Sequence, residues 1–232
     1  MRTIAIYGGR FHPFHKGHKA AYDYLVDKYG INNVFVATSD SQSPLTSPFS
    51  FVDKREQMIF MGVPEEKVFQ TKMPYLAPEI TKFFDPLSTK VVFAISDKDR
   101  DRFSFKKKDG TLTYMQPLDE KSAEPFEYHT YLEVVPTYEF SINGDTVSSA
   151  TEIRNLYIGA DSKTKASIIK QLYGKFSKQI KRCFDQKLRI TECANIILDA
   201  CTTRMLTEDR KLAVLAEKIL ESEDSHSEKH TS

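Results

Sequence analysis

Apolar and polar positions alternate along the chain with two periods, one typical of strands and one of helices. Buried strands are predicted by four short apolar runs, at residues 3–7, 33–38, 68–70 and 90–96. Helices are predicted by apolar positions three or four residues apart, over residues 18–28, 51–61 and 79–84. Strands that alternate with helices favour a Rossmann-like α/β fold, a doubly wound parallel sheet with its ligand at the carboxyl ends of the strands.

The second half of the chain has a different pattern. After a polar segment with a turn at 106–110, further strands are expected at 132–135 and 137–142, and a helix at 151–157. Helical spacing of apolar residues then extends over 162–184 and 191–220, and the last residues are polar. We therefore expect an α/β domain over 1–157, a C-terminal helical appendage over 158–221 and a disordered tail over 222–232.

Composition and charge exclude some classes of protein. The 232 residues include 33 basic and 32 acidic side chains, a net charge of +1, so overall charge indicates no polyanionic partner. No apolar run is long enough to span a membrane, and the start of the chain lacks the pattern of a secretory leader. The three cysteines fit no zinc-binding spacing. We expect a cytoplasmic protein with reduced cysteines and no membrane partner.

Eleven residues behind the first strand, GGRFHPFHKGH at 8–18, carry the chemistry. Gly8 and Gly9 allow the backbone to approach a ligand, and the helix that follows offers free N–H groups to an anion. His15 and His18 are three residues apart, so both can face one phosphate, and Arg10 could bind the same group. Imidazole N–H groups stabilise charge on a phosphoryl oxygen. The alternative is a polar loop that happens to contain histidines.

GRFHPFHKGH resembles the signature of the H-x-G-H nucleotidylyltransferase superfamily, in the form typical of archaeal-type nicotinamide-nucleotide adenylyltransferases. SATEIR, at 149–154, is similar to the second signature of that family, and residues 39–59 are similar to a third block. Ser47 and Ser50 depart from that block, where Asn and Thr are usual. The chain has no Trp, and segment 97–136 looks more like phage-encoded relatives than cellular enzymes.

The resemblance implies a set of site residues. Catalytic roles fall on His15, His18 and Arg154. Nucleotide binding falls on Gly8, Gly9, Arg10, Phe11, Lys16, Gly17, Ser149, Thr151 and Ile153. Binding of the second substrate falls on Ser39, Arg55 and Asp97. No residue is assigned as a metal ligand, because Mg²⁺ is expected to bridge the phosphate oxygens of the nucleotide.

The reaction implied joins the phosphate of an acceptor to the α-phosphate of a nucleoside triphosphate and releases pyrophosphate. ATP with nicotinamide mononucleotide, giving NAD, is the first expectation. Another phosphorylated small-molecule acceptor, such as phosphopantetheine, or a CTP-dependent reaction is the alternative within the enzyme class.

Two readings outside the enzyme class stay open. The first is a nucleotide sensor that binds ATP without turnover. The second is a nucleic-acid-binding protein that acts through the basic segment 161–190, where Lys175, Lys178 and Lys181 lie. The preferred explanation of that segment is a helix with one apolar face on the core and a basic face in solvent, so nucleic acid is not the expected partner. Self-association into a homo-oligomer is also left open.

Overall fold

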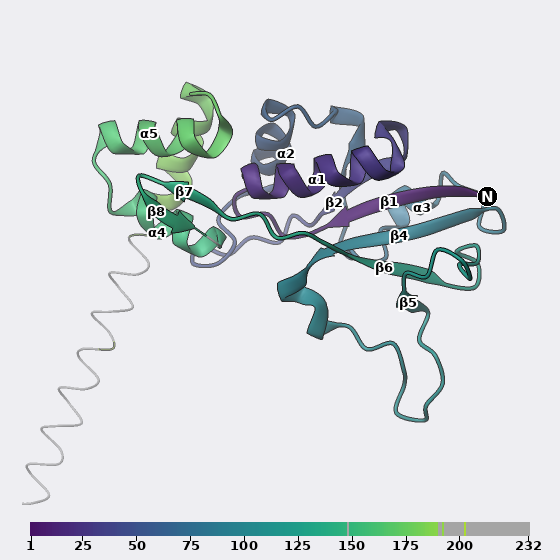
Figure 1. Ribbon diagram of the computed structural model, residues 1–232. Coiled ribbons are helices and arrows are strands. Elements are labelled where there is room, and N and C mark those ends of the chain that lie inside the picture. The colour runs from purple at the N-terminus through teal and green to yellow at the C-terminus, as the bar shows by residue number, and fades with distance from the viewer. Residues whose placement is uncertain (148, 190–191, 193–201, 203–232) are drawn as a thin grey trace, which may run out of the picture.

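The computed structural model describes residues 1–147, 149–189, 192 and 202 (Figure 1). The helical pattern at 191–220 and the polar tail at 222–232 therefore lie almost entirely outside the described residues. No helix of the described part is long and apolar enough to cross a lipid bilayer.

A six-stranded parallel sheet forms the centre of the molecule, which confirms the predicted fold class. Its strands follow the order β3-β2-β1-β4-β6-β5. Their bounds are β1 Arg2–Gly8, β2 Val34–Thr38, β3 Val68–Gln70, β4 Thr89–Ser96, β5 Met115–Pro117 and β6 Thr130–Val135. Ala5 of β1 is in register with Val34 on one side and Val92 on the other. The chain reverses its direction of winding between β1 and β4, where ligands bind in sheets of this kind.

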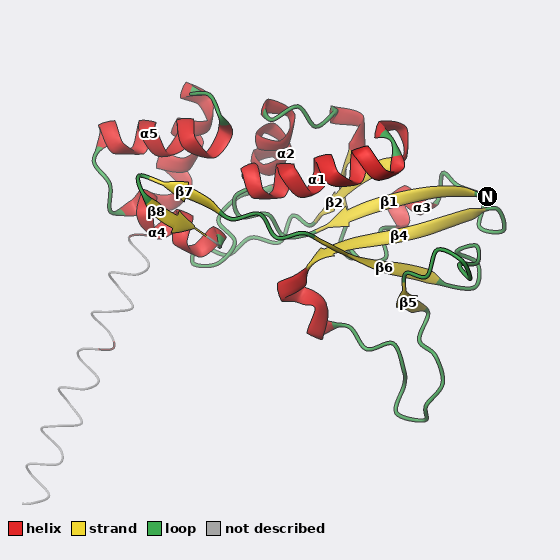
Figure 2. Ribbon diagram, in the orientation of Figure 1, coloured by secondary structure: helices red, strands yellow, loops and turns green. Residues whose placement is uncertain are grey.

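Apolar side chains cover both faces of the sheet because successive residues of a strand point to opposite sides. On one face, Ala5 and Tyr7 join a core under helices α1, Lys16–Tyr29, and α2, Phe51–Phe60 (Figure 2). On the other face, Ile4 and Ile6 join a second core with the short helix α3, Pro78–Thr81. Three short 3₁₀ helices complete this part, η1 Ile31–Asn33, η2 Glu65–Lys67 and η3 Asp97–Arg102.

The remaining elements gather beyond the carboxyl ends of β1 and β4 (Figure 1). They are the antiparallel pair β7, Phe140–Ile142, and β8, Asp145–Val147, the helices α4, Ala150–Ile158, and α5, Ser162–Tyr173, and helical residues 178–189. They share a third apolar cluster, to which the loop after β2 contributes the fully buried Phe49. The cluster therefore joins residues on both sides of the boundary expected at 157, while that boundary itself stays a prediction.

Four details differ from the expected elements. The strand at 137–142 begins only at Phe140 and pairs with β8 instead of joining the main sheet. Strands β5 and β8, MQP and DTV, were not predicted, because neither contains two adjacent apolar residues, as β3 does with Val68 and Phe69. Helix α3 ends at Thr81 and not at residue 84. The helical stretch 162–184 is interrupted at Gly174, whose φ of 74° ends α5.

Candidate active site

The turn between β1 and α1 places His15 at the start of the helix. His15 is the N-cap residue of α1, and its Nδ1 accepts a hydrogen bond from the Gly17 N–H at 3.1 Å. A side-chain acceptor at this position satisfies one of the free N–H groups of a helix start. Because a neutral imidazole has one donor and one acceptor, the His15 proton is on Nε2.

His15 and His18 form a stacked pair. Their ring centroids are 3.7 Å apart, with 27° between the ring planes. Burial, together with the nearby Lys16, lowers the pKa of His15 to about 3. Burial and the neighbouring His15 ring hold the pKa of His18 well below its usual value. Both rings are therefore neutral near pH 7, and they offer N–H groups instead of positive charge. The predicted pair is thus brought together as the spacing implies.

Aromatic side chains support His18 from below the turn. The Phe11 ring lies edge-on to the rings of Tyr7, Phe14 and His18, with centroid distances of 5.2, 5.5 and 5.0 Å. Phe11 is 5% exposed and has a left-handed φ of 51°. Its side chain therefore belongs to the core beneath the histidine and does not face an open site.

The glycines of the turn are packed against by the protein itself. A Cβ at Gly9 would lie 2.6 Å from the Phe11 ring. A Cβ at Gly8 would lie 3.0 Å from both the Pro74 carbonyl and the Tyr75 ring. The absence of a side chain is thus needed already for this packing. Close approach of a ligand to the same backbone stays a prediction.

The segment before β7 covers the start of α1. A Cβ at Gly17 would meet the Tyr138 carbonyl and the His15 ring, each at 3.1 Å. Phe140 lies 5.2 Å from the His15 ring, and the Lys16 Nζ lies 4.5 Å above the Phe140 ring. Gly17 therefore has a steric role, and Lys16 is held beside the histidine pair.

Arg154 connects the second motif to the first. Helix α4 begins with a capping box formed by Ser149 and Glu152. One turn later, the Arg154 Nη1 donates to the His12 carbonyl at 2.7 Å, and Nη2 donates to Thr151 Oγ1 at 3.1 Å. Burial and the nearby Arg10 lower the Arg154 pKa. Two motifs about 130 residues apart in sequence are therefore in direct contact, while Ile153 points into the third apolar cluster.

Lys54 is a site residue that the sequence analysis did not assign. Its side chain is fully buried, and Nζ donates to the Arg10 carbonyl at 3.1 Å, to Thr38 Oγ1 at 2.9 Å and to the Ser39 carbonyl. Burial, opposed by Asp40 and Asp53, lowers the Lys54 pKa to about 8. Lys54 thus ties the loop after β1 to the loop after β2.

The assigned neighbour, Arg55, forms an ion pair with Glu65 at the start of η2. Residues 54 and 55 are adjacent in the KR pair, and successive residues of a helix point in different directions. The register of α2 therefore selects Lys54 for the site. A signal for this existed in the capping box of Ser50 and Asp53, which fixes where α2 begins.

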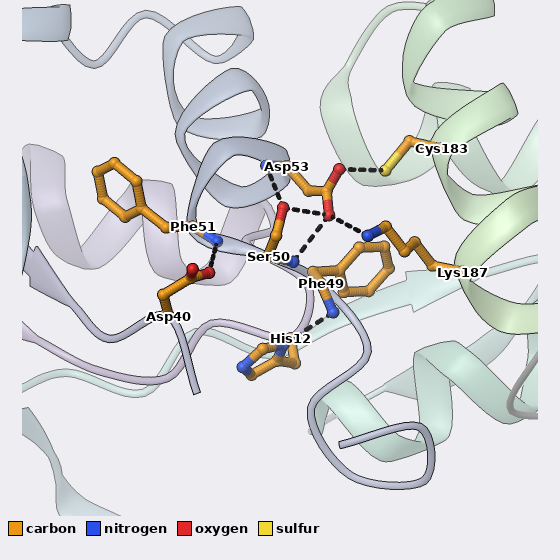
Figure 3. A network of polar contacts seen from close by, with 8 residues as sticks. All are labelled: His12, Asp40, Phe49, Ser50, Phe51, Asp53, Cys183 and Lys187. Atoms are coloured by element: carbon orange, nitrogen blue, oxygen red, sulfur yellow. Dashed lines mark hydrogen bonds and ion pairs between the residues drawn. The ribbon is translucent and has the colours of Figure 1, made fainter. Parts of the chain in front are cut away.

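His12 is the second site residue that was not assigned. It is 4% exposed, and its Nδ1 accepts the Phe49 N–H at 3.3 Å (Figure 3). Burial, with the positive charges of Lys54, Arg154 and Arg10, lowers its pKa to about 3. His12 falls at a position that the motif leaves variable, so the resemblance gave it no role.

The other assigned residues lie at strand ends around this cluster. Arg10 is exposed, directly after β1 and Gly9, and Ser39 follows β2. Asp97 is exposed at the start of η3, directly after β4. β1 and β4 are neighbours in the sheet, so Arg10 and Asp97 flank its switch point.

The arrangement is rich in hydrogen-bond donors. Neutral imidazoles, two guanidinium groups and the start of α1 meet at one edge of the sheet. Within the described part of the chain, no three His, Cys, Asp or Glu side chains form a group that could hold a metal ion. Such a site is suited to an anion with several oxygens, as a phosphate is.

Solved structures of other proteins are similar to this chain in fold. The chain superposes on a bifunctional NMN adenylyltransferase/ADP-ribose pyrophosphatase from Francisella tularensis with a TM-score of 0.53 and 16% identity, over 88% of this chain and 57% of that chain. A protein from Vibrio parahaemolyticus assigned as a nicotinate-nucleotide adenylyltransferase gives 0.47 and 18%, over 83% and 97%. A nicotinic acid mononucleotide adenylyltransferase from Plasmodium falciparum, complexed with NaAD, gives 0.48 and 14%, over 80% and 96%.

The superposition on the Francisella protein, with its TM-score of 0.53, is the comparison that supports the fold assignment. This chain has the fold of part of an NMN adenylyltransferase structure and spans little more than half of that protein's length. The fold expected from the motif resemblance is therefore confirmed. No family model matches the sequence, and no curated protein matches it either.

Proposed function

We propose that the protein is a nucleotidylyltransferase that transfers a nucleoside monophosphate from a nucleoside triphosphate to a phosphorylated acceptor. The observation that supports this most strongly is the direct contact between the two predicted motifs, with Arg154 bound to the His12 carbonyl beside the stacked His15 and His18. The fold shared with the Francisella enzyme supports the same reaction class.

The proposed mechanism needs no covalent bond between enzyme and substrate. The acceptor's phosphate attacks the α-phosphate, and pyrophosphate leaves. His15 and His18 donate hydrogen bonds to the oxygens on which negative charge develops, and the Gly17 N–H, bonded to His15 Nδ1, keeps that donor fixed in orientation. Arg154 and the N-terminus of α4 bind the β- and γ-phosphates, and Arg10 provides a further guanidinium.

Mg²⁺ is the proposed cofactor. The donors gathered at the site are N–H groups, which repel a cation, and no group of three His, Cys, Asp or Glu side chains is found among the described residues. The residues present would therefore fit a Mg²⁺ ion held mainly by the triphosphate, and Asp97 is the one carboxylate among the assigned residues. When bound, Mg²⁺ neutralises phosphate charge.

ATP and nicotinamide mononucleotide, giving NAD, are the proposed substrates. The motif resemblance supports this pair, and the solved structures of similar fold are enzymes named for nicotinamide or nicotinic acid mononucleotide. A different phosphorylated acceptor, such as phosphopantetheine, is the alternative.

Release of pyrophosphate tests the proposal. ATP and CTP are each incubated with Mg²⁺ and a panel of acceptors headed by nicotinamide mononucleotide. We expect release with ATP and that acceptor, and a loss of at least a hundredfold in His18→Ala, whose missing donor is replaced by water at best. Turnover only with another acceptor would replace nicotinamide mononucleotide as the proposed acceptor and leave the proposed reaction class unchanged. ATP binding with no release across the panel would contradict the enzyme and favour a nucleotide sensor.

A further inference from the structure

His12 has one ring nitrogen in use and one without a partner. Because Nδ1 accepts the Phe49 N–H, the proton of the neutral ring is on Nε2. Nε2 is buried and has no hydrogen-bond partner among the described residues. A buried donor left unpaired destabilises the folded protein. Such a donor inside a candidate site indicates a partner other than the described residues, and a bound ligand is such a partner.

The charges around His12 select the kind of partner. The groups that act on the ring are the side chains of Arg10, Lys54 and Arg154, and all three are cations. Arg154 is also bonded to the His12 carbonyl, so its guanidinium lies next to the same residue. An N–H donor among cations is satisfied best by an oxyanion, because a cationic or purely donating group would be repelled.

The His12 ring is held in one orientation. The Phe49 ring stacks on it, with centroids 6.3 Å apart and 22° between the planes. Phe49 in turn contacts the Phe184 ring at 4.9 Å. Both residues are fully buried, so the imidazole cannot turn to exchange its two nitrogens without moving this packing.

Asp53 connects the loop that contains Phe49 to helical residues 178–189. Its carboxylate accepts hydrogen bonds from Ser50, which follows Phe49, and from the Cys183 thiol at 3.3 Å (Figure 3). It also forms an ion pair with Lys187 at 3.1 Å. Helical residues 178–189 therefore position the segment that orients His12.

We propose that His12 is a third imidazole donor of the site and that its Nε2–H binds a phosphate oxygen of a substrate. This inference rests on the proposed function and adds a binding residue to it. The shared chemistry is a phosphate oxyanion, which can come from the triphosphate or from the acceptor's monophosphate.

Two substitutions separate the two ring nitrogens. His12→Asn keeps an acceptor near the place of Nδ1 and removes the distal donor. His12→Gln places an amide N–H near Nε2. Binding of ATP, inorganic tripolyphosphate and nicotinamide mononucleotide is measured by titration calorimetry. We expect His12→Asn to weaken at least one of them tenfold or more, and His12→Gln to recover most of the loss.

The pattern of losses identifies the source of the oxyanion. Losses with ATP and tripolyphosphate together indicate the triphosphate, and a loss with the mononucleotide alone indicates the acceptor. Equal affinities of wild type and His12→Asn for every ligand would overturn the inference, since the N–H would then be satisfied by water. If the variants do not fold, the ¹⁵N resonance of His12 Nε2 in the wild type decides, and no shift on ligand addition would overturn the inference.

The two proposals fail in different ways. Tight phosphate binding that depends on His12, without pyrophosphate release for any acceptor, would overturn the proposed nucleotidylyltransferase activity. It would leave intact the proposal that His12 donates a hydrogen bond to phosphate. If His12→Asn leaves both turnover and ligand affinities unchanged, the proposed role of His12 would be overturned and the proposed activity would stand. A wild-type protein that binds none of the ligands would overturn both.

Discussion

At the scale of single residues, the candidate site combines neutral rings with buried cations. His12 and His15 each use Nδ1 to accept a backbone N–H, which leaves the proton on Nε2. Donors fixed in this way need no reorganisation when charge develops on a substrate. Lys54 has the complementary task, since its ammonium group binds the backbone oxygens of two loops.

The buried Lys54 gives a pH dependence with a definite sign. Its folded pKa of about 8 lies below the unfolded value, so between pH 8 and 10.5 the unfolded chain binds more protons than the folded one. Lys54 therefore makes the free energy of unfolding rise with pH in this window, by about 1 kcal/mol per pH unit. The measurement is urea unfolding of wild type and Lys54→Met from pH 7 to 10.

The difference in stability between wild type and Lys54→Met isolates the titration of Lys54, because every other titrating group is common to both proteins. The stability of wild type relative to the variant should increase from pH 8 upwards and stay level below it. Parallel curves over the whole range would contradict a lowered pKa.

Sequence patterns identified the site residues that carry a motif and missed those defined by packing. His15 and His18 follow from their spacing and Arg154 from the motif resemblance; the structure stacks the two imidazoles and bonds Arg154 to the His12 carbonyl of the same motif. Lys54 is adjacent to the assigned Arg55 in the sequence, but only the register of α2 shows that Lys54, and not Arg55, points inward. The role of His12 depends on Phe49, 37 residues away in sequence, which no local pattern reports.

At the scale of elements, the start of α1 is enclosed by a segment that is distant in sequence, the connection between β6 and β7. Strands with four or more apolar residues were predictable, because burial on both faces leaves an unbroken apolar run. The segment around Tyr138 has no such run, and its position over Gly17 is accompanied by contacts of Phe140 with His15 and Lys16. Contacts of this kind depend on long-range packing and could not be predicted.

Gly17→Ala tests that enclosure. The added Cβ would lie 3.1 Å from both the Tyr138 carbonyl and the His15 ring, so one of them must move. We expect a loss of about 1–2 kcal/mol in stability, typical of mild overpacking, and a loss of more than tenfold in pyrophosphate release.

Gly159→Ala is the matched control for this substitution. Its φ of −73° suits alanine, and the nearest atom, the Asn155 carbonyl oxygen, would be 3.7 Å from the new Cβ. Stability should be unchanged or higher by about 0.5 kcal/mol, with normal turnover. Equal behaviour of the two variants would contradict a special steric role for Gly17.

At the scale of the whole molecule, the third apolar cluster joins the edge of the sheet that carries the candidate site to the C-terminal helices. Phe49 comes from the loop after β2, Tyr157 from α4 and Phe184 from the helical residues 178–189. The Phe184 ring lies between the other two, with its centroid 4.9 Å from that of Phe49 and 5.1 Å from that of Tyr157. We therefore expect the two halves of the described structure to unfold together.

Phe184→Ala measures this connection. The fully buried ring leaves a large cavity, so the variant should lose about 3–5 kcal/mol in stability. Far-ultraviolet circular dichroism and tyrosine fluorescence should give one coincident transition in urea, since the cluster includes Tyr157 and Tyr173. Phe176→Ala, at a side chain 48% exposed, should change stability by less than about 1 kcal/mol. Separate transitions in the wild type would show that the halves are independent.

The order of strands also determines which strands lie at the two edges of the sheet. The outermost strands, β3 and β5, have only three residues each, and Pro117 at the end of β5 lacks an N–H. An incoming strand from another copy would find too few free backbone groups on either flank to register against. Sheet-to-sheet polymerisation is thereby disfavoured at both flanks, and the long central strands β1 and β4 keep all their pairing capacity inside the molecule.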